Sequence, residues 1–170
     1  IDVHPTDPDI AFVAVHGRYW TANPDRGLYR TRDGGATWEH VLYVNDRTGA
    51  NDVIIAPSDP SVVYATTWEN HPGVSGPSSG VWKSEDAGTT WRRLGGGLPS
   101  GPKTGRIGLA VSSADPAKAY VLVDNLNKSE TRGAEVYRTV DGGETWSRTH
   151  AADLLIFPSI GWYFADIYLD

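Results

Sequence analysis

Short runs of apolar and alternating apolar–polar residues follow one another along the whole chain, which predicts β-strands rather than helices. Residues 10–15 are nearly all apolar, as in a strand that is buried on both faces. Gly, Pro, Asn and Asp, the residues that favour turns, separate the runs. The pattern therefore predicts an all-β chain of short strands.

An eight-residue pattern, S/T-x-D-x-G-x-T-W, occurs three times, as TRDGGATW (31–38), SEDAGTTW (84–91) and TVDGGETW (139–146). Each copy lies between two strand-like runs, which predicts a tight hairpin. The aspartate can accept hydrogen bonds from the turn, the glycine can take a positive φ, and the tryptophan begins the next strand. A catalytic group is not needed in every repeat, so we expect these residues to be structural: Asp33, Gly35, Trp38, Asp86, Gly88, Trp91, Asp141, Gly143 and Trp146.

A second motif repeats in phase with the first, as VHPTDP (3–8), IAPSDP (55–60) and VSSADP (111–116). The steps between its copies are about 52 and 56 residues, a period typical of propellers, and each repeat holds four strand-like runs, as one propeller blade does. The sequence therefore predicts three four-stranded antiparallel blades and the first strand of a fourth. Three blades do not close a ring, so we expect a fragment of a larger β-propeller. The expected boundaries are about 1–44 for blade one, 53–94 for blade two, 106–148 for blade three, and 162–170 for the start of blade four.

The repeated turn resembles the Asp-box, or BNR repeat. The chain is similar to Asp-box β-propellers of the bacterial glycosyl-hydrolase-like and VPS10 (sortilin)-like groups. That resemblance implies a secreted, periplasmic or cell-surface protein, with a polysaccharide or a peptide as ligand and the remaining blades of the same protein as further partners. It does not decide activity, because the box is structural in enzymes and non-enzymes alike.

The connections after the second and fourth strands of each blade are long and differ between repeats. They are expected at the end of the propeller opposite the Asp-boxes, and varied loops on a repeated scaffold are where function is usually carried. Aromatic side chains there can stack on sugar rings, and arginines can hold a carboxylate. The alternative is that these side chains only pack the loops together. The ligand-binding candidates are Arg18, Tyr19, Trp20, Trp68, His71, Arg106, Trp162 and Tyr163.

Glycoside hydrolysis requires two carboxylates about 5–10 Å apart. Four carboxylates fall near the loops or the start of an inner strand and are the catalytic candidates: Asp46, Asp52, Glu69 and Asp166. A sialidase-like site is disfavoured, because Arg106-Ile107 is followed by Gly108 and the Arg-Ile-Pro motif of that family is absent. A xyloglucanase-like site would use two aspartates from different blades, neither of which can be assigned here. A non-enzymatic, sortilin-like binding propeller and a pure scaffold remain the alternatives.

Composition narrows the function further. The net charge is -6 without a basic stripe, which argues against a nucleic-acid partner. There is no cysteine, and the five histidines lack zinc-ligand spacing, so we expect neither a metal nor a cofactor. A calcium loop at 46–52 is a weak alternative, because the EF-hand spacing is missing. No apolar run is long enough to span a membrane.

Overall fold

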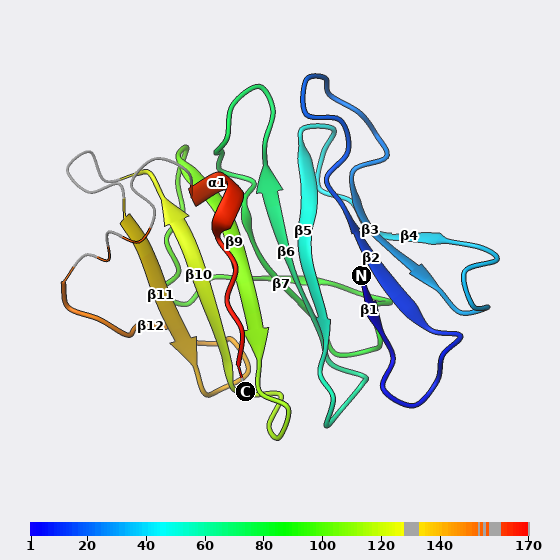
Figure 1. Cartoon of the computed structure of the whole chain (residues 1–170). Coiled ribbons are helices and arrows are strands. Elements are labelled where there is room, and N and C mark those ends of the chain that lie inside the picture. The colour runs from blue at the N-terminus through cyan, green and yellow to red at the C-terminus, as the bar shows by residue number, and fades with distance from the viewer. Residues whose placement is uncertain (128–132, 153, 155, 157–160, 170) are drawn as a thin grey trace.

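The computed structural model describes residues 1–127, 133–152, 154, 156 and 161–169. These residues form three four-stranded antiparallel sheets that stand side by side (Figure 1), with the strands of each sheet in chain order. The predicted all-β propeller fragment is confirmed, and we call the sheets blades one to three. In the described part of the chain the only helix is the single turn α1 (Gly161–Phe164).

The strands have the following bounds. Blade one holds β1 (Asp2–Val3), β2 (Ala11–Val15), β3 (Gly27–Thr31) and β4 (Glu39–Leu42). Blade two holds β5 (Thr48–Ile55), β6 (Val63–Glu69), β7 (Gly80–Ser84) and β8 (Arg92–Leu94). Blade three holds β9 (Thr104–Val111), β10 (Ala119–Asn125), β11 (Gly133–Thr139) and β12 (Ser147–Arg148).

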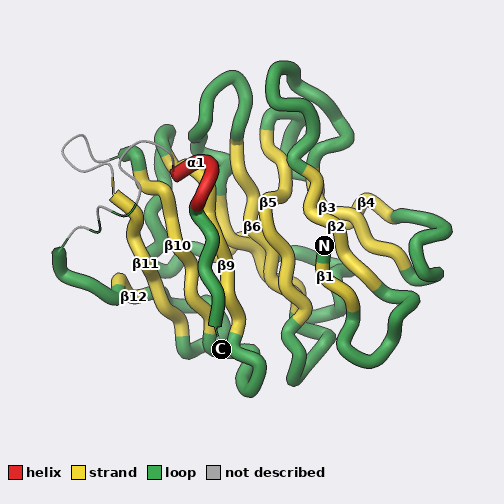
Figure 2. The backbone as a smooth tube through the Cα atoms, viewed as in Figure 1, coloured by secondary structure: helices red, strands yellow, loops and turns green. Residues whose placement is uncertain are grey.

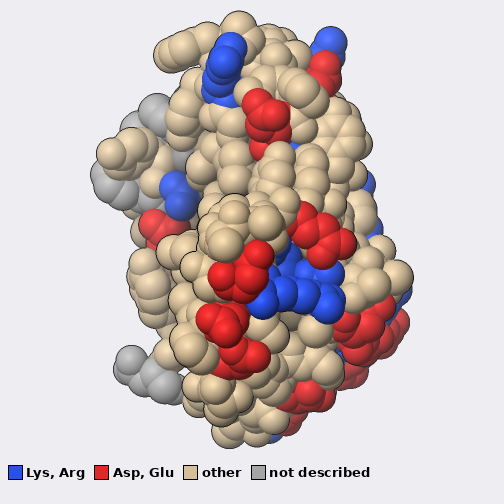
Figure 3. Space-filling model, turned by 90° about the vertical axis from the view of Figure 1, so that its right-hand side faces the viewer, with Lys and Arg blue, Asp and Glu red and all other residues tan. Residues whose placement is uncertain are grey.

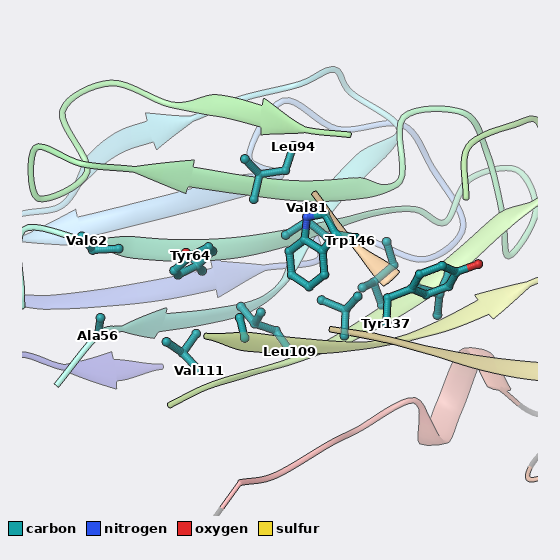
Figure 4. Close-up of a cluster of buried hydrophobic side chains, with 13 residues drawn as sticks. Ala56, Val62, Tyr64, Val81, Leu94, Leu109, Val111, Tyr137 and Trp146 are labelled. Carbon is teal, nitrogen blue, oxygen red and sulfur yellow. The ribbon is translucent and has the colours of Figure 1, made fainter. Parts of the chain in front are cut away.

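The blades are held together by two apolar layers. Phe12, Leu28 and Leu42 of blade one pack against blade two, and a larger cluster joins blade two to blade three. Figure 4 shows this larger cluster, in which Tyr64 faces Leu109. The second strands of blades two and three are buried almost throughout, because apolar side chains cover both of their faces. The prediction that residues 10–15 are buried on both faces is wrong: Phe12 is buried, but Val13, Ala14 and Val15 are half-buried, because blade two covers only one face of β2.

The inner strands begin earlier than the apolar pattern indicates. The pairing of β5 with β6 starts at Thr48 and passes a bulge between Ala50 and Asp52. This part of β5 is mostly polar, so the pattern of apolar residues does not indicate a strand there. The segment 165–169 runs beside β9 (Figure 1), so close that a Cβ on Gly108 would lie 2.3 Å from the carbonyl oxygen of Ala165. This is where the sequence places the start of blade four, which stays a prediction.

The connections between strands lie at the two opposite ends of the blades, as the green loops and yellow strands in Figure 2 show. At one end, which we call the box end, each Asp-box hairpin contacts the Asp-Pro turn of its own blade. Gly34 N donates to Asp9 O at 3.0 Å, and Gly142 N donates to Ala117 O at 3.0 Å. The opposite end, which we call the loop end, carries the long connections 16–26, 70–79 and 95–103.

The three boxes use the same contacts. In the first, Thr37 Oγ1 donates to Asp33 Oδ2 at 2.6 Å and Thr37 N donates to Asp33 Oδ1 at 2.9 Å. These bonds, led by that of the Thr37 hydroxyl, lower the pKa of Asp33 to about 2, and the equivalent threonines lower the pKa values of Asp86 and Asp141 to about 2. Gly35 takes a φ of 91°, which an L-residue with a side chain rarely adopts. Each carboxylate is thus engaged by its own turn.

Candidate functional site

The first loop at the loop end is organised around a buried arginine. The guanidinium of Arg26, which is 0% exposed, donates to the backbone carbonyls of His16, Arg18 and Thr21 and to Asn70 Oδ1 of blade two. It therefore fixes loop 16–26 and ties it to the next blade. Sequence reasoning missed Arg26, because an arginine before a strand looks like any surface cation until its neighbours are known.

The aromatic candidates Trp68, Tyr19 and Trp20 differ in exposure, and Trp68 is a buried support. Trp68 is 1% exposed, its indole N–H donates to Val74 O at 2.9 Å, and it meets Tyr19 edge-on at 6.3 Å. Trp68 therefore supports loops 16–26 and 70–79 and is not accessible to a ligand. Tyr19 is 47% exposed and Trp20 is 90% exposed, so both rings of this loop are accessible to a ligand.

Glu69 ends β6, and His71 lies in loop 70–79. Glu69 Oε2 accepts a hydrogen bond from Ser78 N at 2.9 Å, and a Cβ on Gly76 would lie 2.3 Å from its carboxyl group. The carboxylate of Glu69 is therefore enclosed by loop 70–79. His71 is partly exposed and precedes a cis proline, Pro72.

Arg18 and Asp46 are both exposed. Each contributes its backbone carbonyl to loop anchoring, Arg18 to Arg26 and Asp46 to Asn23 N at 2.8 Å. The structure does not join the side chains of Asp46 and Glu69 to the other two carboxylate candidates.

Asp52, Arg106 and Asp166 lie along one groove of about 520 Å³ between the inner strands, which we call the channel groove. Arg106 Nη2 donates to Asp166 Oδ1 at 2.7 Å, and Arg106 Nη1 donates to the carbonyl oxygen of Tyr163 at 2.6 Å. The residues that line the groove include Asn51, Asp52, Arg106, Leu109, Asp166 and Tyr168.

The carboxylate of Asp52 bridges two blades. Its Oδ1 accepts from Val53 N at 3.0 Å and its Oδ2 accepts from Leu109 N of blade three at 3.3 Å. Burial raises the pKa of Asp52, the two backbone hydrogen bonds oppose that shift, and Asp166 adds to it. A carboxyl group with a raised pKa is the kind that donates a proton in glycoside hydrolysis.

His16, at the start of loop 16–26, is near the charged side chains of Arg106 and Arg26. Burial, followed by the charges of Arg106 and Arg26, lowers its pKa to about 4, so the imidazole is neutral at pH 7. Its ring meets Trp68 edge-on at 5.8 Å. His16 therefore adds no positive charge beside Arg106, and the groove itself is lined by three carboxylates, those of Asp2, Asp52 and Asp166, and one arginine.

The last predicted residues lie at the C-terminal helical turn. Tyr163 is 59% exposed, and α1 stands at the loop end of the molecule (Figure 1). The side chain of Trp162 lies outside the described residues.

Comparison with known proteins gives the family. A family model described as "Sortilin, neurotensin receptor 3" matches residues 26–154, which is most of the chain. The chain belongs to the Sortilin-Vps10 family. The predicted resemblance to BNR-repeat propellers is confirmed.

This Sortilin-Vps10 chain is also similar to curated glycoside hydrolases. It is 28% identical to a xyloglucanase from Paenibacillus sp over 175 residues, which cover 84% of the chain and 15% of that protein. It is 28% identical to a sialidase from Bacteroides fragilis (strain YCH46) over 137 residues, which cover 76% of the chain and 24% of that protein. The chain thus spans about a quarter or less of the length of these relatives.

Solved structures agree on the fold of the Sortilin-Vps10 chain. The Niastella koreensis GH74 enzyme aligns with a TM-score of 0.64 at 20% identity, over 86% of this chain and 21% of that one. An ancestral GH74 enzyme aligns with a TM-score of 0.68 at 17% identity, over 92% of this chain and 19% of that one. At these identities the likeness shows the fold alone.

Two further properties of the Sortilin-Vps10 chain come from the described residues. Among them, no three His, Cys, Asp or Glu side chains gather closely enough to hold a metal ion. Within the same residues, no helix has the length and apolar character needed to cross a membrane.

On the side of blade one, Lys and Arg side chains lie next to Asp and Glu (Figure 3), and no broad area of one charge is visible.

Proposed function

We propose that this chain is part of a secreted Asp-box propeller that binds or hydrolyses a glycan at the end opposite the Asp-boxes. The observation that carries the proposal is the channel groove, where Asp52 and Asp166 accompany Arg106. Tyr19 and Trp20 add exposed rings in the first connection of the loop end. Carboxylates bind sugar hydroxyls, and exposed aromatic rings suit the C–H faces of sugars. The glycoside hydrolases among the relatives support the same class of ligand.

In this proposal the ligand lies across the loop end, with Trp20 and Tyr19 beneath a sugar ring and the channel groove receiving polar groups. Asp52, with its raised pKa, is the proton donor if the site is hydrolytic. Asp166 is the second carboxylate, and Arg106 holds it in place. The Asp-box residues form the scaffold, because their carboxylates are engaged within their own turns.

A second candidate function is a sortilin-like propeller that binds a peptide without chemistry. The observation that favours it is that Asp52 and Asp166 are both engaged, one by backbone N–H groups and the other by Arg106. Such a site is suited to hold a ligand, and hydrolysis would require Asp166 to separate from its partner.

The test uses the protein at the length that its gene encodes. Binding and release of reducing ends are measured with xyloglucan and a sialylated glycan, and binding is measured with neurotensin as the peptide probe. We expect glycan binding, and we expect Trp20→Ala to weaken it roughly tenfold, the size of effect that an exposed tryptophan anchor gives.

Two carboxylate variants separate binding from hydrolysis. If the site is hydrolytic, Asp52→Asn removes the release of reducing ends and leaves binding largely intact. Asp59→Asn is the matched control, because Asp59 lies in the Asp-Pro turn at the box end. Binding of neurotensin without binding of either glycan would contradict the first proposal and favour the second.

A further inference from the structure

A second pocket lies at the loop end, between blades two and three. It measures about 630 Å³, which is within the range of pockets that hold small ligands. It is lined by residues 95–101 and by Pro77, Ser79 and Gly80, where the preceding loop enters β7. None of the described residues lines both this pocket and the channel groove, so the two are separate sites.

The guanidinium of Arg93 stands in the wall of this pocket, which we call the Arg93 pocket. Its Nη2 donates to Pro77 O and to Ser79 O, both at 2.8 Å, and a Cβ on Gly80 would lie 2.8 Å from its Nε. Arg93 and these three neighbours all line the pocket, and Arg93 is exposed. Its positive charge is therefore open to a ligand.

No carboxylate of the described chain balances this charge. Within the part of the chain that the structure describes, no Asp or Glu forms an ion pair with Arg93. Its neighbour in β8, Arg92, by contrast pairs with Glu144 at 2.6 Å. The two carbonyl groups that accept from Arg93 have no net charge, so they orient the guanidinium without neutralising it.

The internal repeat shows which carboxylate is missing. Arg148 in β12 occupies the same position in blade three as Arg93 in blade two. Arg148 Nε lies 3.6 Å from Glu135 Oε1. Four residues before the Asp-box, where blade three has Glu135, blade two has Gly80. Blade two thus keeps the arginine and lacks its carboxylate, which leaves a place for a carboxylate that a ligand supplies.

We propose that the Arg93 pocket binds a sugar acid, with the carboxylate of the sugar on the guanidinium of Arg93. The two bonds from Nη2 to backbone carbonyls fix the guanidinium and leave the two N–H groups of Nη1 for the ligand. Hydrogen bonds between arginine and a carboxylate are among the strong ones in proteins, because both groups are charged. This site goes beyond the proposed function, because it uses none of the residues named there.

The rest of the lining favours a sugar over a peptide side chain. Four aliphatic side chains of the pocket are at most 4% exposed and so offer little apolar surface: Val81, Leu94, Ile107 and Val123. The turn closed by Leu98 N and Gly95 O at 3.0 Å presents the N–H groups of Gly96 and Gly97, which have no acceptor among the described residues. Sugar hydroxyls can accept from such groups, whereas a bound peptide is usually anchored by apolar side chains.

The test is calorimetric binding of trigalacturonic acid, a short uronic acid oligomer, to the protein at the length that its gene encodes. Maltotriose, a neutral sugar of the same length, is the reference. We expect Arg93→Gln to weaken binding of trigalacturonic acid roughly tenfold to a hundredfold, because a charged hydrogen bond is lost, and to leave binding of maltotriose unchanged. Arg92→Gln is the matched control, because Arg92 does not line the pocket and pairs with Glu144.

A second variant rebuilds the ion pair of blade three in blade two. Gly80→Glu places a carboxylate where blade three has Glu135, and the nearest atoms to its new Cβ belong to the flexible side chain of Arg93. The new carboxylate should occupy the guanidinium and weaken binding of trigalacturonic acid as much as Arg93→Gln does. Thermal unfolding of both variants shows that the fold is kept.

Three outcomes would overturn the proposal. The first is no measurable binding of trigalacturonic acid, and the second is the same affinity for it in the wild type and in a folded Arg93→Gln or Gly80→Glu variant. The third is binding of neurotensin that depends on Arg93 without binding of trigalacturonic acid, which would assign the pocket to the carboxylate of a peptide. The proposed function is tested apart from these, through Trp20→Ala and Asp52→Asn.

Discussion

The two ends of this molecule are built in opposite ways. At the box end the same contact recurs, since the threonine hydroxyl meets the aspartate Oδ2 at 2.6, 2.6 and 2.5 Å in the three boxes. At the loop end the three long connections each have a different anchor: Arg26 for loop 16–26, Trp68 for loop 70–79, and Asn127 for loop 95–103, where it accepts from Lys103 N at 2.9 Å. Repetition serves the scaffold, and the loops that depart from the repeat are free to form a site.

Replacing a tryptophan by alanine should give the largest difference between the two ends in the free energy of unfolding. Trp146→Ala at the box end is expected to lower the free energy of unfolding by about 3–5 kcal/mol, because the ring is 5% exposed in the core between blades two and three. Trp20→Ala at the loop end should change it by less than about 0.5 kcal/mol, because that ring is 90% exposed. Urea denaturation followed by circular dichroism measures both, and equal losses would remove the distinction between the two ends.

The next largest effect on the free energy of unfolding is expected from two glycine substitutions, both in Asp-boxes at the box end. Gly88→Ala should cost about 2–4 kcal/mol, because its φ is 81° and the new methyl group would meet the ring of Phe12. Gly35→Ala has a similar φ of 91°, but its nearest neighbour is the ring of Trp38 at 3.7 Å, so only the backbone strain of about 1–2 kcal/mol remains.

Thermal and urea unfolding of the two glycine variants, purified side by side, give the comparison. Equal losses of stability in the two variants would contradict the assignment of the extra cost of Gly88→Ala to the ring of Phe12.

The smallest effect is expected from acid, and it contrasts the aspartates of the two ends. The pKa of each box aspartate is lowered from 3.8 to about 2, so its contribution to stability is complete above pH 3.8 and is lost as the pH falls through 2. Burial raises the pKa of Asp52, so Asp52 takes up its proton at a higher pH than the boxes do. Because the box carboxylates are exposed to water, the loss of stability in acid should be smaller than the loss caused by Trp146→Ala or by Gly88→Ala.

Carboxyl carbon shifts recorded by NMR between pH 1.5 and 7 assign these titrations. Asp33, Asp86 and Asp141 should titrate together near pH 2, well below Asp52. Box aspartates that titrate with Asp52 would contradict the contacts described for the boxes.

The blades were predictable because their signals are periodic. Each Asp-box repeats at the same phase as an Asp-Pro turn, and the apolar second strands lie between them. The beginning of β5 was not predictable, because Thr48 to Asp52 is mostly polar and pairs through a bulge. The grouping of Asp52, Arg106 and Asp166 also lay beyond the sequence, since it depends on how three separate segments meet along the channel groove.

What the sequence determined by itself is local. The Asp-box closes through bonds between residues at most four positions apart, such as Asp33 to Thr37, so the eight-residue pattern is enough to specify the turn. The tertiary structure decided which loop side chains face water. Trp20 in loop 16–26 and Trp68 near the end of β6 were both candidates for a ligand-binding ring, yet one is 90% exposed and the other 1%. The burial of Trp68 depends on His16 and Tyr19 of another blade, and no pattern around Trp68 records those neighbours.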